Sequence, residues 1–392
     1  MADTPPEGHG PVRYGPGVPG TGLPVPGELA GVLAAAAGAP GEPPGGGAVL
    51  REAARGYWWR RGLHSAAEDL VAAAGPQPLL LALLGAYTGD DARGGDVLMS
   101  RPCPAWWAPQ ARLLGRGAYR VPTPAECGGV PDPFALLETV RRVRAEGGAP
   151  RVLLLSVADD PTGTVAPPET VRETCEAAVG EGLHIISDES WRDTVHRPRE
   201  TVLVSPAEMC PGDVTVLSDL AGALLPPSWP AAVARFPPTA AGAAHRDRVL
   251  DFLAALGAAV AGPVAAAAAH ALDEPGGLVG LRERGIEGYA RVGAEVHRAV
   301  LACGGLARPP VAGRHLYADF GPLREGLGWC GVGDSMELEE YLSARLGVPV
   351  PGGHRFGDEL GALRARLPTA PFLSAALLPH LTTTLTPHAS NS

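Results

Sequence analysis

The chain has 392 residues and contains no lysine, since the 32 residues counted as lysine plus arginine are all arginines. An amine that forms an imine with an aldehyde must lose its proton, which a buried lysine can do. Arginine cannot, because its guanidinium stays charged at any relevant pH. A covalent imine between a lysine side chain and an aldehyde ligand is therefore excluded.

Cysteine and histidine are sparse and scattered. The six cysteines form no C-x-x-C pair, and the eleven histidines show no ligand spacing. Metal-ligand spacing is therefore absent, and a disulfide framework is not expected in a chain of this length. The sequence also lacks G-x-S-x-G, H-E-x-x-H and the P-loop, so no common hydrolase or phosphate-binding motif is present.

A net positive charge is also lacking, and no long apolar run is free of proline, glycine and alanine. The net charge of −10 argues against nucleic acid as a partner. Two uncharged stretches, 70–89 and 252–272, reach membrane-spanning length, but proline, glycine and alanine favour buried helices of a globular protein. No basic segment precedes an apolar run near the first residues, so a signal peptide is not expected. These features predict a cytoplasmic protein that does not enter membranes.

The clearest positive pattern lies between residues 151 and 235. Apolar strand-like runs at 151–157, 184–188 and 214–219 are separated by loops and by an amphipathic helix at 167–180. Another amphipathic helix is expected at 134–145. Alternating strands and helices of this length indicate an α/β protein with a doubly wound, mainly parallel sheet, whose ligand loops follow the carboxyl ends of the strands.

The loops after these strands contain short sequences that resemble the motifs of a known protein family. They read Asp-Pro-Thr-Gly at 160–163, Asp-Glu-Ser-Trp at 188–191, and Ser-Asp-Leu-Ala-Gly at 218–222. They resemble Asn-Pro-Thr-Gly, Asp-Glu-x-Tyr and Ser-x-Ser-Lys of the class I/II, fold-type-I pyridoxal-phosphate aminotransferases. The resemblance covers roughly residues 49–380. It implies a large sheet domain and a small α+β C-terminal domain.

The resemblance also divides the chain. It predicts a large cofactor-type α/β domain at 49–243, a long helical connection at 244–295 and the small domain at 296–392. The proline- and glycine-rich residues 1–48 show no sustained periodicity, and we expect an irregular arm there.

Several family positions carry different residues here. The lysine that forms the Schiff base falls on Gly222, which leaves no catalytic residue to name. The phosphate-binding serine and arginine become Asp219 and Pro230, so a carboxylate and a proline ring replace two donors. The aromatic residue that stacks on the cofactor ring becomes Pro104. Tight phosphate binding is therefore not expected.

The remaining family positions give a set of candidate site residues. By resemblance, an aspartate pairs with the pyridinium nitrogen, a glycine turn binds the phosphate, and an arginine binds the substrate carboxylate. Arg366 is the first choice for that arginine and Arg364 the second. The candidate cofactor-binding residues are Gly75, Gln77, Asp160, Asp188, Trp191 and Ser218.

Three functions are compatible with the sequence. The leading hypothesis is a degenerate aminotransferase homologue that acts in a biosynthetic pathway by binding a ligand or a partner. The alternatives are an enzyme that holds pyridoxal or pyridoxamine phosphate non-covalently, and an ordinary aminotransferase. The resemblance implies a homodimer, or a heterodimer with an active homologue. It implies pyridoxal phosphate as cofactor, bound without a covalent link or not at all.

Overall fold

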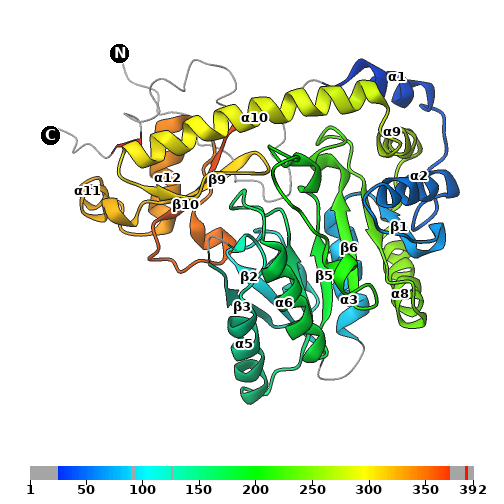
Figure 1. Cartoon of the computed structure of the whole chain (residues 1–392), viewed down its shortest axis with the longest axis horizontal. Helices are drawn as coiled ribbons and strands as arrows, with labels where there is room; N and C mark the ends of the chain where they lie inside the picture. The colour runs from blue at the N-terminus through cyan, green and yellow to red at the C-terminus, as the bar shows by residue number, and fades with distance from the viewer. Residues whose placement is uncertain (1–24, 90–93, 125–126, 371–384, 387–392) are drawn as a thin grey trace, which may run out of the picture.

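The computed structural model describes residues 25–89, 94–124, 127–370 and 385–386 (Figure 1). Its centre is a seven-stranded sheet in the order β1-β7-β6-β5-β4-β2-β3. β7 runs antiparallel to β1 and β6, and the other neighbouring pairs are parallel. The predicted mainly parallel α/β sheet is thus confirmed. The strands are β1 Leu70–Ala73, β2 Asp96–Arg101, β3 Ala118–Pro122, β4 Pro150–Ser156, β5 His184–Asp188, β6 Val214–Asp219 and β7 Ala232–Arg235.

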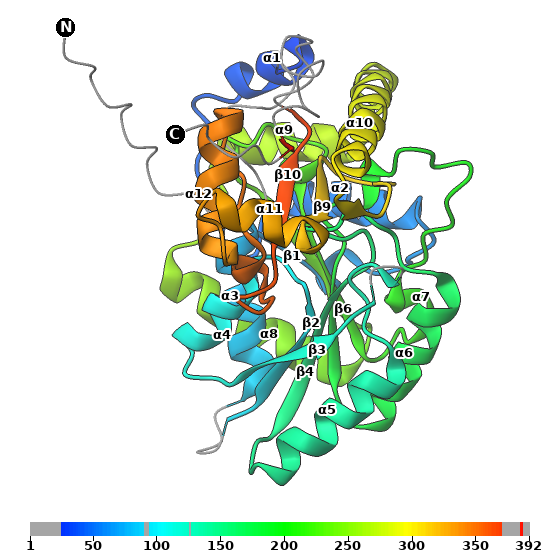
Figure 2. The ribbon, with the colours of Figure 1, turned by 90° about the vertical axis from the view of Figure 1, so that its left-hand side faces the viewer.

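Helices cover both faces of this sheet because the strands are apolar on both sides. In β4, Val152 and Leu154 pack toward one face, and Leu153 and Leu155 toward the other. Figure 2 shows α3 and α8 on one side of the strands and α5 and α6 on the other. One layer contains α3 Pro76–Thr88, α4 Trp107–Leu113 and α8 Ala240–Leu256, and the other α2 Ala48–Trp59, α5 Pro133–Ala145, α6 Pro168–Gly180, α7 Pro206–Met209 and α9 Gly262–Leu272.

A second, smaller sheet is antiparallel, in the order β10-β9-β8. The long helix α10 reaches from the large sheet to this smaller one (Figure 1), where its Val296 and Val300 join the core beneath β9. The predicted small α+β part of the fold is confirmed. Its elements are α10 Gly276–Ala302, β8 Leu306–Ala307, β9 His315–Asp319, α11 Arg324–Trp329, α12 Ser335–Leu346 and β10 Arg364–Pro368.

The expectation of an irregular arm over residues 1–48 is wrong within the part that the structure describes. Helix α1 spans Gly27–Ala35, and its Leu29 is buried against α9. The prolines that suggested an irregular chain lie outside this nine-residue run, which can therefore form a helix. No helix of the described residues is long and apolar enough to cross a membrane.

Candidate functional site

Four buried aspartates meet where β4, β5 and β6 end. Asp159 and Asp160 follow β4, while Asp188 and Asp219 are the last residues of β5 and β6. Each is at most 4% exposed. Burial raises the pKa of Asp159 and of Asp219 to about 7 and that of Asp188 to about 6. Because β4, β5 and β6 are parallel neighbours, their carboxyl ends lie at the same edge of the sheet. The four aspartates therefore lie close together there and form what we call the acidic edge.

Asp188 is held by its own loop. Its Oδ1 accepts hydrogen bonds from the Ser190 amide at 3.0 Å and the Ser190 hydroxyl at 2.5 Å. The Ser190 hydroxyl in turn accepts a bond from the Asp219 amide at 2.9 Å. These contacts tie the ends of β5 and β6 together. They also occupy one oxygen of the carboxylate that the resemblance assigns to the cofactor ring.

Gly222 lies in a 3₁₀ turn, η4 Leu220–Gly222, that is pressed against the preceding loop. A Cβ added at Gly222 would lie 2.5 Å from the Ser190 carbonyl oxygen, well inside van der Waals contact. The Gly222 carbonyl accepts a hydrogen bond from Arg314 at 2.5 Å, and Asp219 Oδ1 accepts one from the Ala221 amide at 3.1 Å. With this backbone, no side chain can project from position 222.

The turn before α3 has few donors for a phosphate. Gly75 has a φ of 105° and its amide already bonds to the Ala73 carbonyl. Pro76 and Pro78 have no N–H, so Gln77 supplies the one free donor of the first turn. Pro230 packs beside Gly75, 3.4 Å from the point where a Cβ would sit. The structure thus brings Gly75, Gln77 and Pro230 together, but not as an anion site.

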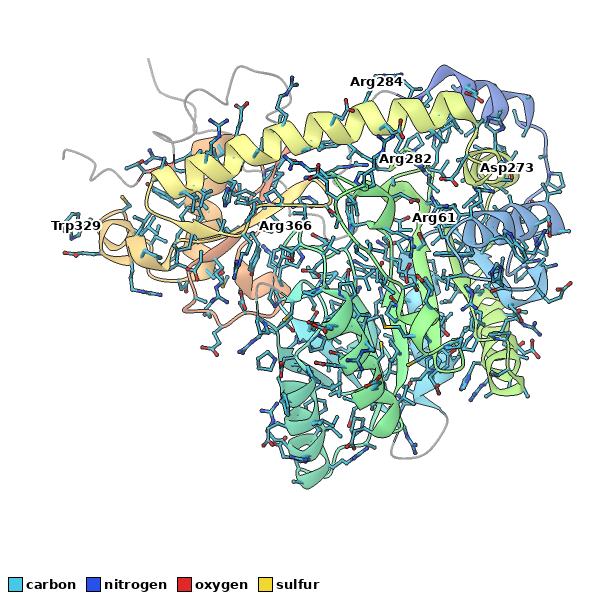
Figure 3. The ribbon with its side chains drawn as sticks, viewed as in Figure 1. Arg61, Asp273, Arg282, Arg284, Trp329 and Arg366 are labelled. Carbon is cyan, nitrogen blue, oxygen red and sulfur yellow. The ribbon has the colours of Figure 1, made fainter. Side chains whose placement is uncertain are left out.

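Arg366 and Asp160 form a buried ion pair between the two sheets. Figure 3 shows Arg366 near the junction of the large and the small sheet. Its Nη1 donates to both Asp160 oxygens, at 2.7 and 2.9 Å, and its guanidinium lies 5.0 Å from the centre of the Phe356 ring. His315 Nδ1 lies 3.7 Å from Asp160, and burial lowers the pKa of His315 well below its usual value, so the ring is neutral. Asp160 is therefore already paired with a cation within the protein.

The other predicted residues are arranged differently. Arg364 pairs with Asp319 at 3.0 Å and with Asp358 at 3.3 Å, because alternate residues of β10 face opposite sides. The Trp191 ring packs edge-on against His315, with centroids 5.8 Å apart. Ser218 is buried in β6, opposite Val233 of β7. The structure thus brings Asp160, Trp191 and Arg366 together through His315 and does not bring Arg364 to them.

Sequence reasoning missed four residues of this region. Asp159 adjoins the aligned Asp160, and one of its oxygens is buried without a hydrogen-bond partner among the described residues. Ser190 lies inside an aligned block but between its diagnostic positions. Arg314 immediately precedes β9, and His315 is the first residue of that strand. Two adjacent polar residues directly before a run of buried strand residues are the sequence signal that could have identified Arg314 and His315.

Pyridoxal phosphate, the cofactor implied by the resemblance, does not fit the residues at these positions. The phosphate turn offers one first-turn amide, position 222 cannot carry a side chain, and Asp188 is engaged by Ser190. Within the described residues, no three histidine, cysteine, aspartate or glutamate side chains are placed to hold a metal ion. The buried carboxyl groups of the acidic edge do not favour binding of an anion.

No protein-family model matches the chain. Among curated proteins, a probable aspartate/prephenate aminotransferase of Thermus aquaticus is 29% identical over 168 residues, which is 43% of this chain and 41% of that protein. The chain thus matches less than half the length of this relative.

Solved structures match over nearly the whole chain. Aspartate aminotransferase from Thermus thermophilus with maleate has a TM-score of 0.79 at 21% identity, over 92% of this chain and 88% of that one. Aromatic aminotransferase from Pyrococcus horikoshii has a TM-score of 0.79 at 19% identity, covering 95% and 94%. N-Succinyldiaminopimelate aminotransferase from Mycobacterium tuberculosis gives 0.77 at 21%, covering 92% and 90%. This chain therefore has the fold of the fold-type-I aminotransferases.

Proposed function

We propose that this chain is a member of the aminotransferase class I/II family that does not perform lysine-dependent transamination. It acts in a biosynthetic pathway by binding a small molecule or a protein partner. The observation that carries the proposal is the absence of lysine, together with Gly222 at the Schiff-base position. The close approach of the Ser190 carbonyl to Gly222 supports it, because the loop has closed over the space a lysine needs.

The substrate-binding arginine supports the same proposal. In the family that this chain resembles, the matching arginine binds the substrate carboxylate. Here Arg366 is buried and already bound to both oxygens of Asp160. An incoming carboxylate would have to displace this intramolecular partner, which is held at high effective concentration. Amino-acid recognition in the family's manner is therefore disfavoured.

Absorbance spectroscopy with added pyridoxal phosphate tests the proposal. We expect no new band that borohydride fixes to an internal residue of the chain, because no side chain can form the imine. Peptide mapping of the reduced protein separates such an adduct from one on the terminal α-amino group. Borohydride-fixed pyridoxal phosphate on an internal peptide, or measurable amino transfer, would overturn the proposal.

A further inference from the structure

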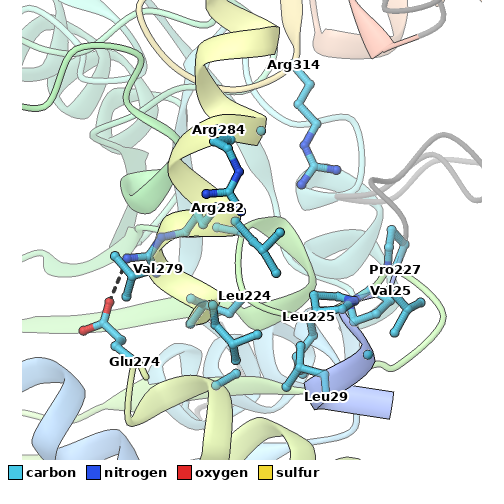
Figure 4. Close-up of a pocket in the computed structure, with 18 residues that line it drawn as sticks. Val25, Leu29, Leu224, Leu225, Pro227, Glu274, Val279, Arg282, Arg284 and Arg314 are labelled. Carbon is cyan, nitrogen blue, oxygen red and sulfur yellow. Dashed lines mark hydrogen bonds and ion pairs between the residues drawn. The ribbon is translucent and has the colours of Figure 1, made fainter. Parts of the chain in front are cut away.

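A groove with one apolar and one cationic side lies apart from Asp188 and Arg366. It has a volume of about 500 Å³ and lies between α1, residues 223–227 and the start of α10 (Figure 4). This volume suits a small organic ligand. Val25 and Leu281 are each 42% exposed on its rim, so apolar surface is left open to solvent. The apolar side is formed by Val25, Leu29, Leu224, Leu225 and Pro227.

The other side of the groove carries three arginines, Arg282, Arg284 and Arg314 (Figure 4). The acidic side chain in the lining is Glu274, which also pairs with Arg60 and Arg61 from α2 and its C-terminal end. Glu274 is thus shared by Arg60, Arg61 and Arg282. Because the lining contains three arginines and this one shared carboxylate, the groove carries a net positive charge.

Arg284 and Arg314 add further positive charge to the groove. Arg284 has no carboxylate partner among the described residues and lies on the exposed side of α10. Arg314 donates to the Gly222 carbonyl, but its Nε is buried with no hydrogen-bond partner in the described part of the chain. Its guanidinium is held over the Tyr289 ring at 5.2 Å and near the Trp191 ring at 5.6 Å. Arg314 is therefore pre-positioned with unused donor capacity.

We infer that this groove binds a small amphipathic carboxylate. Its apolar body would lie against Leu224, Leu225 and Leu29, and its carboxylate would accept hydrogen bonds from Arg284 and Arg314. Guanidinium groups bind carboxylates with charge-assisted hydrogen bonds. The apolar wall would contribute through burial of hydrocarbon surface.

The inference deepens the proposed binding role and rests on it only in taking the chain to be a ligand-binding protein. The groove contains neither Asp188 nor Arg366, and binding there needs no cofactor. If pyridoxal phosphate proves to be covalently bound while the carboxylate still binds in the groove, the proposed function fails and this inference stands.

Isothermal titration of the full chain with octanoate tests the inference. We expect saturable binding of one octanoate per chain, and binding of 1-octanol, which has the same chain but no charge, at least about tenfold weaker. Arg284→Gln and Arg314→Gln should each weaken octanoate binding about tenfold. Arg291→Gln, an exposed position on the same helix outside the groove, is the matched control and should bind like the parent protein.

Three results would overturn the inference: no saturable octanoate binding, equal affinity for octanoate and 1-octanol, or unchanged affinity in Arg284→Gln. Arg314 also contacts the Gly222 loop, so Arg314→Gln could disturb folding. Arg284 is exposed and makes no such contact, so Arg284→Gln keeps the test decisive.

Discussion

The buried ion pair between Asp160, which follows β4, and Arg366 of β10 links the large sheet to the small sheet. Removing the cation leaves a buried carboxylate without its partner, which is expected to cost about 3–5 kcal/mol in the free energy of unfolding. Arg366→Gln should show this loss in urea unfolding, and adding Asp160→Asn should recover part of it. Arg197→Gln, whose pair with Glu200 is exposed on both sides, is the control and should cost roughly 0–1 kcal/mol. Equal losses in Arg366→Gln and Arg197→Gln would refute the coupling.

Gly222 is required because the Ser190 carbonyl lies too close for a Cβ, and not because the backbone there has a positive φ. Gly222→Ala places a Cβ against the Ser190 carbonyl and should lower the free energy of unfolding by about 1–3 kcal/mol. Gly180→Ala, at a helical position with open space around it, should be neutral or slightly stabilising. Chemical denaturation of both variants makes the comparison. A Gly222→Ala protein as stable as its parent would mean that the loop moves freely.

The close contact between position 222 and the Ser190 carbonyl should also prevent a single substitution from restoring transamination. Gly222→Lys alone should not give an aldimine absorbance, because the loop must first open and the phosphate position still carries Asp219 and Pro230. Groups that act as a unit are strongly non-additive. Adding Asp219→Ser, Pro230→Arg and Asp160→Asn should recover pyridoxal phosphate binding before any single change does. Robust amino transfer by Gly222→Lys alone would show that the site is intact.

At the scale of the elements, the acidic edge of the large sheet should make stability depend on pH. Burial raises the pKa of Asp219 to about 7 from an ordinary 3.8, so the folded chain binds more protons than the unfolded chain between those values. The contribution of Asp219 to stability is therefore present at low pH and is lost as pH rises toward 7. The slope is at most about 1.4 kcal/mol per pH unit.

Asp219→Asn tests this dependence. The stability of the variant relative to the parent should increase from pH 4.5 to 7 and then level off, as followed by urea unfolding at each pH. Asp213→Asn, at an exposed position just before β6, is the matched control. Buried Asp159 and Asp188 remain in both proteins and act in the same direction. A difference that is flat across this range would contradict the assignment.

The N-terminal turn of α3 supports a second prediction at this scale. Helix N-termini bind phosphate through free amides, but Pro76 and Pro78 remove two of them. Asp219 adds a carboxylate near the phosphate position of the family. We therefore expect pyridoxal phosphate to bind no more tightly than unphosphorylated pyridoxal in calorimetric titrations. Clearly tighter binding of the phosphate ester would contradict the prediction and would show that other arginines bind the phosphate.

At the scale of the whole molecule, we expect a dimer, because aminotransferases of the fold that this chain adopts place their sites at a subunit interface. Light scattering at micromolar concentration should give about twice the chain mass of 40.1 kDa, or the mass of a complex with a homologous partner. A mass equal to one chain would count against the prediction.

The sequence by itself determined the central strands and helices and their order along the chain. The apolar runs that became β4, β5 and β6 and the helices α5 and α6 follow from local periodicity, and so does the parallel sheet they build. The absence of lysine is also a sequence fact, since no folding can supply a residue that the chain lacks.

Only the tertiary structure decided what the altered residues do. Asp160 and Arg366 are 206 positions apart, so no spacing rule could reveal that one neutralises the other. Gly222 is constrained by a carbonyl 32 residues earlier, and the groove takes its arginines and its leucines from segments that meet only after folding. Periodicity reports which face of an element is buried, whereas ion pairs and cavities depend on which side chains from distant segments come within a few ångströms of one another.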